Sequence, residues 1–373
     1  MKLTKSAPKR LYLIPVLSKA LDVLELLQNE RGPVTLEAIY QRSAISKTTV
    51  YRILKTLVHR GYVAQSQDGQ YRLVSRPKKA RFCFGSQSAE MPFSEAVTES
   101  LRLAASSAGV DLTVLDNRYD GATALRNADE FVQSRPDLIL EFQIDQQVAP
   151  VIADKISSAG IPLIAVEIPH PHATFFGVDN FRVGFEAGEY LGQHAKKVWG
   201  GKARWVLGLD IEEAGVVVQS RITGAFEGIR SNLPNISDAS MVRMDVRGMR
   251  EKSYRLVLDF IRRHPKDRGI LIAAATDTSA LGAVRAIREA KWEKYAAIVG
   301  QDCIPEALEE MSLVGSPLIA SVSHQAHTYG PRLIHLGLAI LSGQRVPPYN
   351  YVEHKLVPAA SAREASCRPE AVL

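Results

Sequence analysis

Cysteine is scarce in this sequence, which argues against a disulfide framework or a zinc cluster. The 373 residues include three cysteines, Cys83, Cys303 and Cys367, which lie far apart and form no CxxC pair. Long apolar runs are missing too, since none approaches the roughly 18 residues that span a bilayer. The apolar run LYLIPVL near the N-terminus is short for the core of a secretion signal and is broken by Pro15. We therefore expect a cytoplasmic protein without a membrane partner.

The motifs of common enzyme classes are also missing. The sequence contains no P-loop and no GxGxxG, GxSxG or HExxH motif. His170 and His172 could suggest a metal site, but they flank a proline without a third ligand at helical spacing, so a surface turn is the simpler interpretation. Cys303 could be a reactive thiol, although the role of a small buried hydrophobic residue is commoner. We expect no catalytic residue, no metal site and no cofactor.

Acidic residues are few in the first fifth of the chain. Residues 1–80 hold 15 Lys and Arg against 5 Asp and Glu, a net charge of +10. The remaining residues hold 31 Lys and Arg against 35 Asp and Glu, a net charge of −4. A compact basic module beside a mildly acidic body indicates a polyanion as the partner of that module, and a solvated basic surface is the alternative.

The basic module carries helix and hairpin signals in a defined order. Two segments with apolar residues at helical spacing, 16–30 and 35–44, precede the basic stretch 43–63. In that stretch the apolar residues Val50, Ile53, Leu54, Leu57 and Val58 share one helical arc, and Thr48, Arg52, Lys55 and His59 lie opposite. Ser46 is the expected N-cap and Gly61 the expected stop. The β-prone runs YVAQ and QYRLV follow, joined by SQDG, so the order is that of a winged helix-turn-helix.

The basic module also resembles the DNA-binding domain of the IclR family of bacterial transcription regulators. The resemblance covers about 16–74 and is most specific in SKTTVYRILKTLVHRGYV. It implies operator DNA, a duplex, as the partner. Lys47, Thr48, Thr49, Tyr51 and Arg52 are then expected nearest the major groove, and Lys55 and Arg72 nearest the phosphate backbone. One such module reads only a few base pairs, so we expect a homodimer on a palindromic site.

From about residue 80 the sequence alternates apolar strands with amphipathic helices. Nine strands are predicted, at ARFCFGS, VDLTVLD, DLILEF, IPLIAVEI, ARWVLGL, SMVRMDV, GILIAAAT, AAIVGQD and LIASVSH. Helical patterns such as EAVTESLRLAASSAG and TSALGAVRAIREA separate most of them. This alternation predicts parallel α/β architecture, and nine βα units favour two lobes over one sheet.

Residues 80–358 resemble the type I periplasmic-binding-protein fold, which the ribose-type binding proteins share with the effector domains of LacI-family repressors. Motifs in the matching order include GIPLIAVE, GVDNFRVGFEAGEYLG, SRITGAFEG, TDTSALGAVRAI, VGQD and ASVSH. The resemblance implies a cleft beyond the carboxyl ends of the strands. It assigns seven residues to a sugar-like ligand: Met91, Phe93, Glu167, Arg221, Thr276, Asp302 and His324.

The chemistry of these residues suits a polyol. Glu167 and Asp302 would accept hydrogen bonds from adjacent hydroxyls, Arg221 would donate to them, and Phe93 would cover a C–H face. Three departures from the family pattern stand out. Ile168 occupies a position where sugar binders commonly carry Arg, and Glu167 is longer than the usual Asp. Thr276 and Asp277 stand where many members have Asn-Asp. A modified sugar or another small polar molecule therefore remains open.

The sequence thus predicts an α/β protein with an N-terminal winged helix-turn-helix and a two-lobed type I effector domain. The expected segments are the winged helix at 1–74, a linker at 75–79, the effector domain at 80–358 and a tail at 359–373. Lobe one is expected at about 80–180 and 325–350, and lobe two at 181–324 and 351–358. The expected function is ligand-responsive transcription regulation. A solute-binding protein without DNA function and a sugar-active enzyme remain as alternatives.

Overall fold

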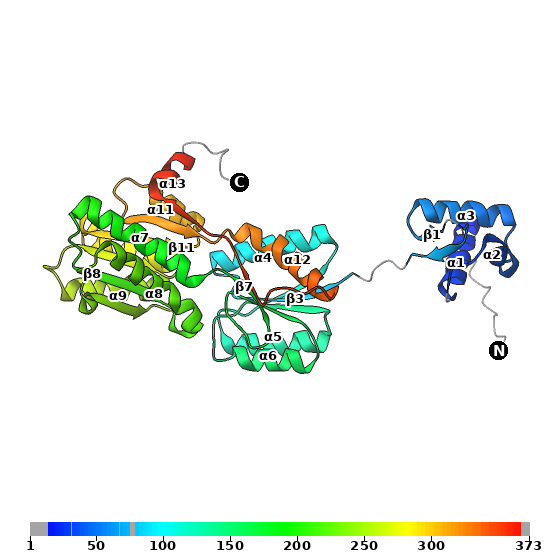
Figure 1. Cartoon of the computed structure of the whole chain (residues 1–373), viewed down its shortest axis with the longest axis horizontal. Helices are drawn as coiled ribbons and strands as arrows, with labels where there is room; N and C mark the ends of the chain where they lie inside the picture. The colour runs from blue at the N-terminus through cyan, green and yellow to red at the C-terminus, as the bar shows by residue number, and fades with distance from the viewer. Residues whose placement is uncertain (1–13, 31, 67, 75–78, 367–373) are drawn as a thin grey trace, which may run out of the picture. The chain divides into compact units, whose positions relative to one another are not determined.

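The computed structural model describes residues 14–30, 32–66, 68–74 and 79–366. The chain divides into two compact units, Met1–Lys78 and Lys79–Leu373, called here the N-terminal and C-terminal units (Figure 1). Cys367 and, apart from Lys79, the expected linker at 75–79 lie outside the described residues.

The N-terminal unit is a winged helix-turn-helix, as the sequence predicted. Its elements are α1 (Pro15–Gln28), α2 (Leu36–Arg42), α3 (Lys47–His59), β1 (Val63–Gln65) and β2 (Tyr71–Leu73). The hydroxyl of Thr35 caps α2 by accepting from the Ala38 N–H at 3.2 Å. Ser46 is the N-cap residue of α3, but its hydroxyl lies 2.9 Å from the Thr49 hydroxyl and caps no backbone N–H. The apolar arc of α3 is buried against α1 and the antiparallel hairpin of β1 and β2.

The C-terminal unit contains two six-stranded sheets, one in each lobe. The sheet of lobe one is parallel, in the order β13 (Tyr349–Tyr351), β7 (Thr174–Gly177), β6 (Leu163–Val166), β5 (Leu138–Glu141), β3 (Arg81–Ser86), β4 (Asp111–Asp116). The sheet of lobe two has the order β14 (Lys355–Pro358), β12 (Leu318–Ser323), β11 (Ala296–Gln301), β10 (Ile270–Ala274), β8 (Trp205–Asp210), β9 (Met241–Asp245). Only β14 runs antiparallel to its neighbour among these described strands. These paired parallel sheets confirm the predicted fold class.

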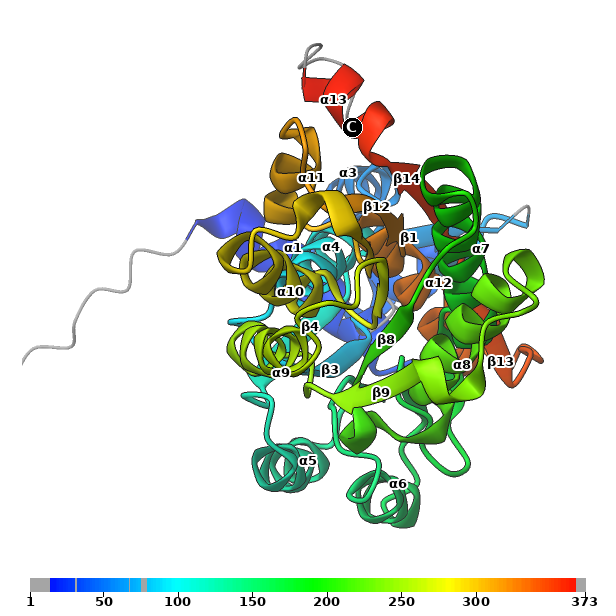
Figure 2. The ribbon, with the colours of Figure 1, turned by 90° about the vertical axis from the view of Figure 1, so that its left-hand side faces the viewer.

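Helices cover both faces of each sheet, because the strands are apolar on both sides. In lobe one, α4 (Pro92–Ala108) packs beside α12 (Tyr329–Leu341), and α5 (Gly121–Ser134) beside α6 (Ala149–Ser158) on the opposite face (Figure 1). In lobe two, α9 (Arg250–Arg263) and α10 (Asp277–Glu289) cover one face, and α7 (Asn180–Trp199) and α8 (Gly215–Asn232) the other (Figure 2). Helix α11 (Pro305–Ser312) completes lobe two.

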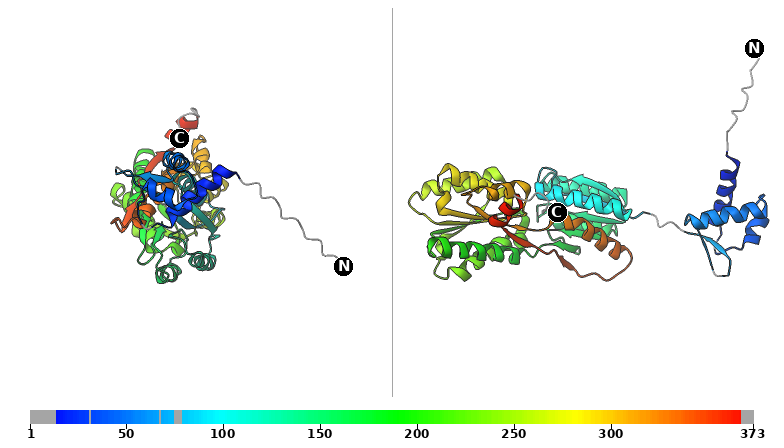
Figure 3. Two further views of the ribbon diagram at one scale, coloured as in Figure 1. Left: turned by 90° about the vertical axis from the view of Figure 1, so that its right-hand side faces the viewer. Right: turned by 90° about the horizontal axis from the view of Figure 1, so that it is seen from above.

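The chain passes between the lobes three times: from β7 to α7, from β12 to α12, and from β13 to β14. Figure 3 shows the two lobes side by side within the C-terminal unit. One apolar cluster continues from lobe one, including Phe84, into lobe two, including Ile222. No described helix is long and apolar enough to cross a membrane.

The structure adds elements that the sequence analysis did not predict. Strands β7, β13 and β14 are three or four residues long and lack a continuous apolar run, so only their pairing with neighbouring strands defines them. Residues 359–366, expected as part of a tail, form helix α13 (Ala359–Ser366), which packs against α11 and buries Ala362.

Candidate functional site

A cavity between the lobes of the C-terminal unit gathers all seven residues predicted to bind a ligand. The space between its lining atoms, including the part open to solvent, is about 590 Å³. The lining includes Met91, Phe93, Glu167, Arg221, Thr276, Asp302 and His324. Backbone and side-chain contacts hold the lobes together beside it: the Gln146 N–H donates to the Glu213 carbonyl at 2.9 Å, and the Tyr119 hydroxyl to the Arg247 carbonyl at 3.1 Å. Both lobes therefore contribute walls to the cavity, and these two contacts join the lobes beside it.

Glu167 enters the cavity from the end of β6 in lobe one. Its φ of +62° is left-handed, and its side chain is 7% exposed. The carboxylate accepts from the Tyr329 hydroxyl at 2.5 Å and from the Val178 N–H at 3.2 Å. Burial raises the pKa of Glu167, and Arg221 and Tyr329 partly offset that rise.

Arg221 faces Glu167 from α8 in lobe two, with Nη2 3.9 Å from Oε2 of the carboxylate. Its Nε donates to Oδ1 of Asn180 at 3.0 Å, and its Nη1 donates to the Ala275 carbonyl at 2.6 Å. Close approach of α7 fixes this part of α8, because a Cβ on Gly184 would lie 1.8 Å from the Arg221 carbonyl oxygen. Arg221 therefore has a fixed direction, and its third nitrogen, Nη2, is directed at the opposite lobe.

Asp302 and His324 line the cavity from lobe two. Burial, followed by the nearby Asp277 carboxyl, raises the pKa of Asp302 well above its ordinary value. Burial and Arg221 lower the pKa of His324 well below 6.5, so its ring is neutral. Gln301 donates through Nε2 to the Val183 carbonyl at 3.5 Å, so its Oε1 accepts from Nε2 of His324 at 2.9 Å. Nδ1 of His324 is then an acceptor, 3.4 Å from Oδ1 of Asp302.

Asp277 lies behind these two residues and is fully buried at the start of α10. It accepts from the Ser321 hydroxyl at 2.7 Å and from the Ile304 N–H at 3.0 Å. Burial raises its pKa to about 7, against the lowering effect of these hydrogen bonds. Asp277 therefore shapes the loop that carries Asp302 rather than lining the cavity.

The remaining predicted residues close the lobe-one side and the α10 end of the cavity. The Phe93 ring makes edge contacts with His324 and Tyr329, with both pairs of centroids 5.7 Å apart. Met91 precedes α4 as its N-cap residue. Thr276 caps α10 by accepting from the Ser279 N–H at 3.2 Å, so its hydroxyl is already engaged by the helix.

Several lining residues were not predicted. They are Gln87, Pro92, Tyr119, Phe142, Ile144, Ile211, Ala214, Val218 and Thr278, together with Ile168, which was noted only as a departure. Val218 could have been found from its spacing, since it lies three residues before Arg221 on the same face of α8. Tyr329, which holds Glu167, starts α12 more than 160 positions later in the sequence and gave no local signal.

The histidine and cysteine alternatives do not form a second site. His170 is buried, contrary to the expected surface turn, and Nδ1 of its ring lies 2.9 Å from the Ile168 carbonyl oxygen. His172 is exposed. No group of three potential metal ligands occurs among the described residues. Burial raises the pKa of the Cys303 thiol to about 12, which keeps it protonated and unreactive.

In the N-terminal unit, the predicted DNA-contacting residues lie on α3 and on the hairpin. Tyr51 is 45% exposed, and Lys55 lies 5.7 Å from the centroid of its ring. Lys47 is 2.5 Å from Glu37 of α2 in an exposed ion pair, which the sequence analysis missed. Thr48 and Arg52 are exposed on α3, Thr49 is half-buried, and Arg72 is exposed on β2.

Solved structures similar to the chain share the fold of the C-terminal unit. An ABC transporter solute binding protein from Mycobacterium smegmatis with bound glycerol has 20% identity and a TM-score of 0.69, covering 77% of this chain and 96% of that one. One from Agrobacterium vitis with bound allitol has 18% identity and a TM-score of 0.68, covering 78% and 99%. One from Actinobacillus succinogenes with bound D-allose has 18% identity and a TM-score of 0.66, covering 77% and 100%. At such identities the likeness shows the fold alone.

The families of the two units follow from direct sequence matches. No curated protein matches the chain. Residues 16–67 match the IclR helix-turn-helix domain, and residues 82–345 match the periplasmic binding protein domain. The second match covers well over half of the 373 residues. The chain therefore belongs to the periplasmic binding protein domain family and carries an IclR helix-turn-helix domain at its N-terminal side.

Proposed function

We propose that this protein is a transcription regulator that binds operator DNA through its N-terminal unit and senses a small polyhydroxylated molecule in the cavity of its C-terminal unit. The observation that carries the proposal is the presence, in one chain, of an IclR helix-turn-helix and of a cavity between two lobes that is lined by Glu167, Arg221 and Asp302. A solute-binding protein without DNA function does not need an IclR helix-turn-helix.

The polar groups of the cavity suit a polyol. Glu167 and Asp302 offer acceptors, Nη2 of Arg221 offers a donor, and Nδ1 of His324 offers a further acceptor. Phe93 provides an aromatic surface for C–H groups. The glycerol, allitol and D-allose held by the similar solute binding proteins are all polyhydroxylated.

Signalling would use the two lobes. Glu167 belongs to lobe one and Arg221 to lobe two, so a ligand that bridges them favours the closed arrangement. In a cytoplasmic homodimer, as we propose, closure would change the freedom of the paired DNA-binding units. A coupling free energy of about 1–3 kcal/mol between ligand and DNA is the usual scale.

The ligand half of the proposal is tested by a thermal-shift screen of polyols and monosaccharides on the full chain. A ligand at 100 times its Kd stabilises the folded state by about 2.7 kcal/mol, which raises the melting temperature measurably. We expect a positive shift with at least one polyol. If no polyol raises the melting temperature at millimolar concentration, the sensing role is wrong. Turnover of a bound sugar would instead favour the enzyme alternative.

The DNA half predicts binding that weakens steeply with salt and depends on Arg52. The probe is a duplex enriched by the full chain from a random-sequence library, compared with a scrambled duplex by fluorescence anisotropy. Each phosphate contact contributes a slope of about −0.9 in log K against log salt concentration. Arg52→Ala is expected to remove most of the preference for the enriched duplex, since base contacts contribute about 1–3 kcal/mol each.

The matched control is Arg60→Ala, because Arg60 is an exposed arginine at the C-cap of α3, eight positions after Arg52. That change should leave the preference between the two duplexes intact. A preference that survives Arg52→Ala contradicts our placement of α3 in the groove. Absence of any enriched duplex would favour the solute-binding alternative.

A further inference from the structure

The cavity between the lobes has an apolar half as well as a polar half. Five aliphatic side chains line it, all buried: Ile144 and Ile168 from lobe one, and Ile211, Ala214 and Val218 from lobe two. None of these five side chains can donate or accept a hydrogen bond. They belong to the apolar cluster that continues through both lobes.

The backbone at Glu167 explains how lobe one presents both halves. In a regular strand, neighbouring side chains point to opposite faces. The left-handed φ of +62° at Glu167 breaks that alternation, so Glu167 and Ile168 both line the cavity. The Ile168 N–H donates to the Val166 carbonyl at 2.7 Å, and His170 contacts the Ile168 carbonyl through Nδ1 at 2.9 Å. Contacts of both the N–H and the carbonyl of Ile168 therefore stabilise the turn that directs its side chain into the cavity.

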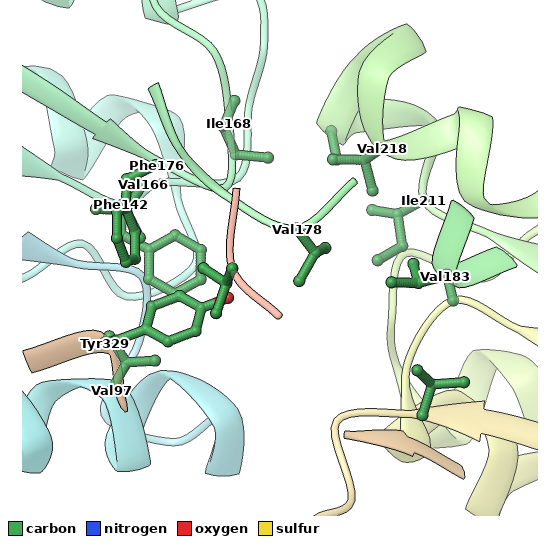
Figure 4. Packing of buried hydrophobic residues seen from close by; sticks show 14 of the residues in the cluster. Val97, Phe142, Val166, Ile168, Phe176, Val178, Val183, Ile211, Val218 and Tyr329 are labelled. Carbon is green, nitrogen blue, oxygen red and sulfur yellow. The ribbon is translucent and has the colours of Figure 1, made fainter. Parts of the chain in front are cut away.

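Lobe two repeats the same pairing of a polar and an apolar residue. Val218 lies one turn before Arg221 on α8, and both line the cavity. Figure 4 shows Ile168 directed from lobe one toward the opposite lobe, where Val218 and Ile211 are directed back at it. Across the cavity, Glu167 of lobe one therefore lies near Arg221 of lobe two, and Ile168 of lobe one faces Val218 of lobe two.

We infer that the ligand is an amphipathic polyol, which carries adjacent hydroxyls at one end and a methyl group at the other, as a 6-deoxyhexose or a methyl glycoside does. This inference rests on the proposed sensing function and narrows its ligand class. A fully hydroxylated hexose would place a hydroxyl against Ile168, Ile211 and Val218, whose side chains offer it no hydrogen bond. The nearby Tyr119 hydroxyl already donates to the Arg247 carbonyl. An unpaired buried hydroxyl costs binding free energy, whereas a methyl group at the same place gains it.

The test compares matched pairs on the full chain by calorimetric titration. The pairs are D-glucose, D-galactose and D-allose, each with its 6-deoxy analogue and its methyl glycosides. In at least one pair the methyl-bearing member is expected to bind tighter, by on the order of tenfold or more. Val218→Thr keeps the volume of the side chain and adds a hydroxyl, so it should reduce that ratio toward one. Ile168→Asn should reverse it.

The matched control is Val314→Thr, at a valine that is 95% exposed and outside the cavity, which should leave the ratio unchanged. Equal or tighter binding of the fully hydroxylated member in every pair that binds overturns the inference and leaves polyol sensing intact. A ratio that neither Val218→Thr nor Ile168→Asn changes also overturns it. If no member of any pair binds, the inference of an amphipathic ligand is wrong. Polyol sensing is then also wrong only if the wider polyol screen gives no thermal shift.

Discussion

Arg221→Ala is expected to weaken binding of the polyol with the largest thermal shift by on the order of 100-fold, because charge-assisted hydrogen bonds are the strongest contacts the cavity offers. Arg221 is the cationic partner of the Glu167 carboxylate across the cavity, at 3.9 Å. Without it, Glu167 and Asp302 would face the ligand as two buried acids, and the loss of Arg221 raises the pKa of both carboxyls further. Calorimetric titration of the variant measures the loss.

The same substitution should lower the free energy of unfolding by about 2–4 kcal/mol, since it leaves buried acceptors on Asn180 and Ala275 without their donor. Binding should therefore be measured at a temperature where circular dichroism shows the variant folded. Arg255→Ala is the matched control, because Arg255 is 73% exposed and pairs only with Glu251 one turn away among the described residues. That control should change stability by less than about 1 kcal/mol and leave ligand affinity unaltered. Unchanged ligand affinity in Arg221→Ala would contradict the assignment of the cavity.

Glu141→Gln is expected to flatten the dependence of stability on pH between about 5 and 8. Glu141 is fully buried at the end of β5, and its Oε1 accepts from Nδ2 of Asn117 at 2.8 Å. Its Oε2 has no hydrogen-bond partner among the described residues. Burial raises the pKa of Glu141 to about 8 from 4.5. The protonated acid therefore stabilises the fold fully below pH 4.5, and that contribution is lost as pH rises toward 8.

As pH rises from about 5 to 8, the free energy of unfolding falls by about 1.4 kcal/mol for each pH unit, because Glu141 stays protonated only in the folded protein. The total loss is on the order of 4 kcal/mol. Denaturant titrations of the ligand-free protein at pH 5, 6, 7 and 8 measure the slope. Asp277, whose pKa burial raises to about 7, titrates in the same direction, so Glu141→Gln should reduce the slope without abolishing it. The exposed Glu309→Gln is the control and should leave the slope unchanged. An equal slope in Glu141→Gln would show that Glu141 is ionised in the folded protein.

Prediction from the sequence succeeded best where periodicity and local capping decide the structure. The arc of Val50, Leu54 and Leu57 required a helix with one buried face, and the cap at Thr35 and the Asp-Gly turn set the neighbouring elements. Continuous apolar strands such as LILE and LIAV required a parallel sheet covered on both faces. Strand β7 was missed because its four residues, TFFG, hold only two apolar side chains in a row and so lack the continuous apolar run of β5 and β6.

The seven residues predicted to bind a ligand were assigned by the resemblance to the type I periplasmic-binding-protein fold, and all seven line the cavity between the lobes. Most of them follow a strand or begin a helix, and the carboxyl ends of parallel strands meet at one edge of a sheet. Residue type also indicated that they are acceptors, donors and an aromatic surface suited to hydroxyl groups. The sequence by itself therefore determined the division into two units, the helix with one buried face in the first unit, and the polar side chains that line the cavity of the second.

Tertiary structure alone decided how these groups act together. The ionisation of Asp302 depends on burial beside Asp277, and that of Glu167 on a hydroxyl from Tyr329, and neither contact has a sequence period. The apolar half exists because Ile168 of one lobe faces Val218 and Ile211 of the other when the lobes close. Such contacts join residues far apart in the chain, so they depend on the packing of two sheets and not on any local preference. Local sequence therefore supplies the polar groups, and the packing of the two lobes decides which groups face one another across the cavity.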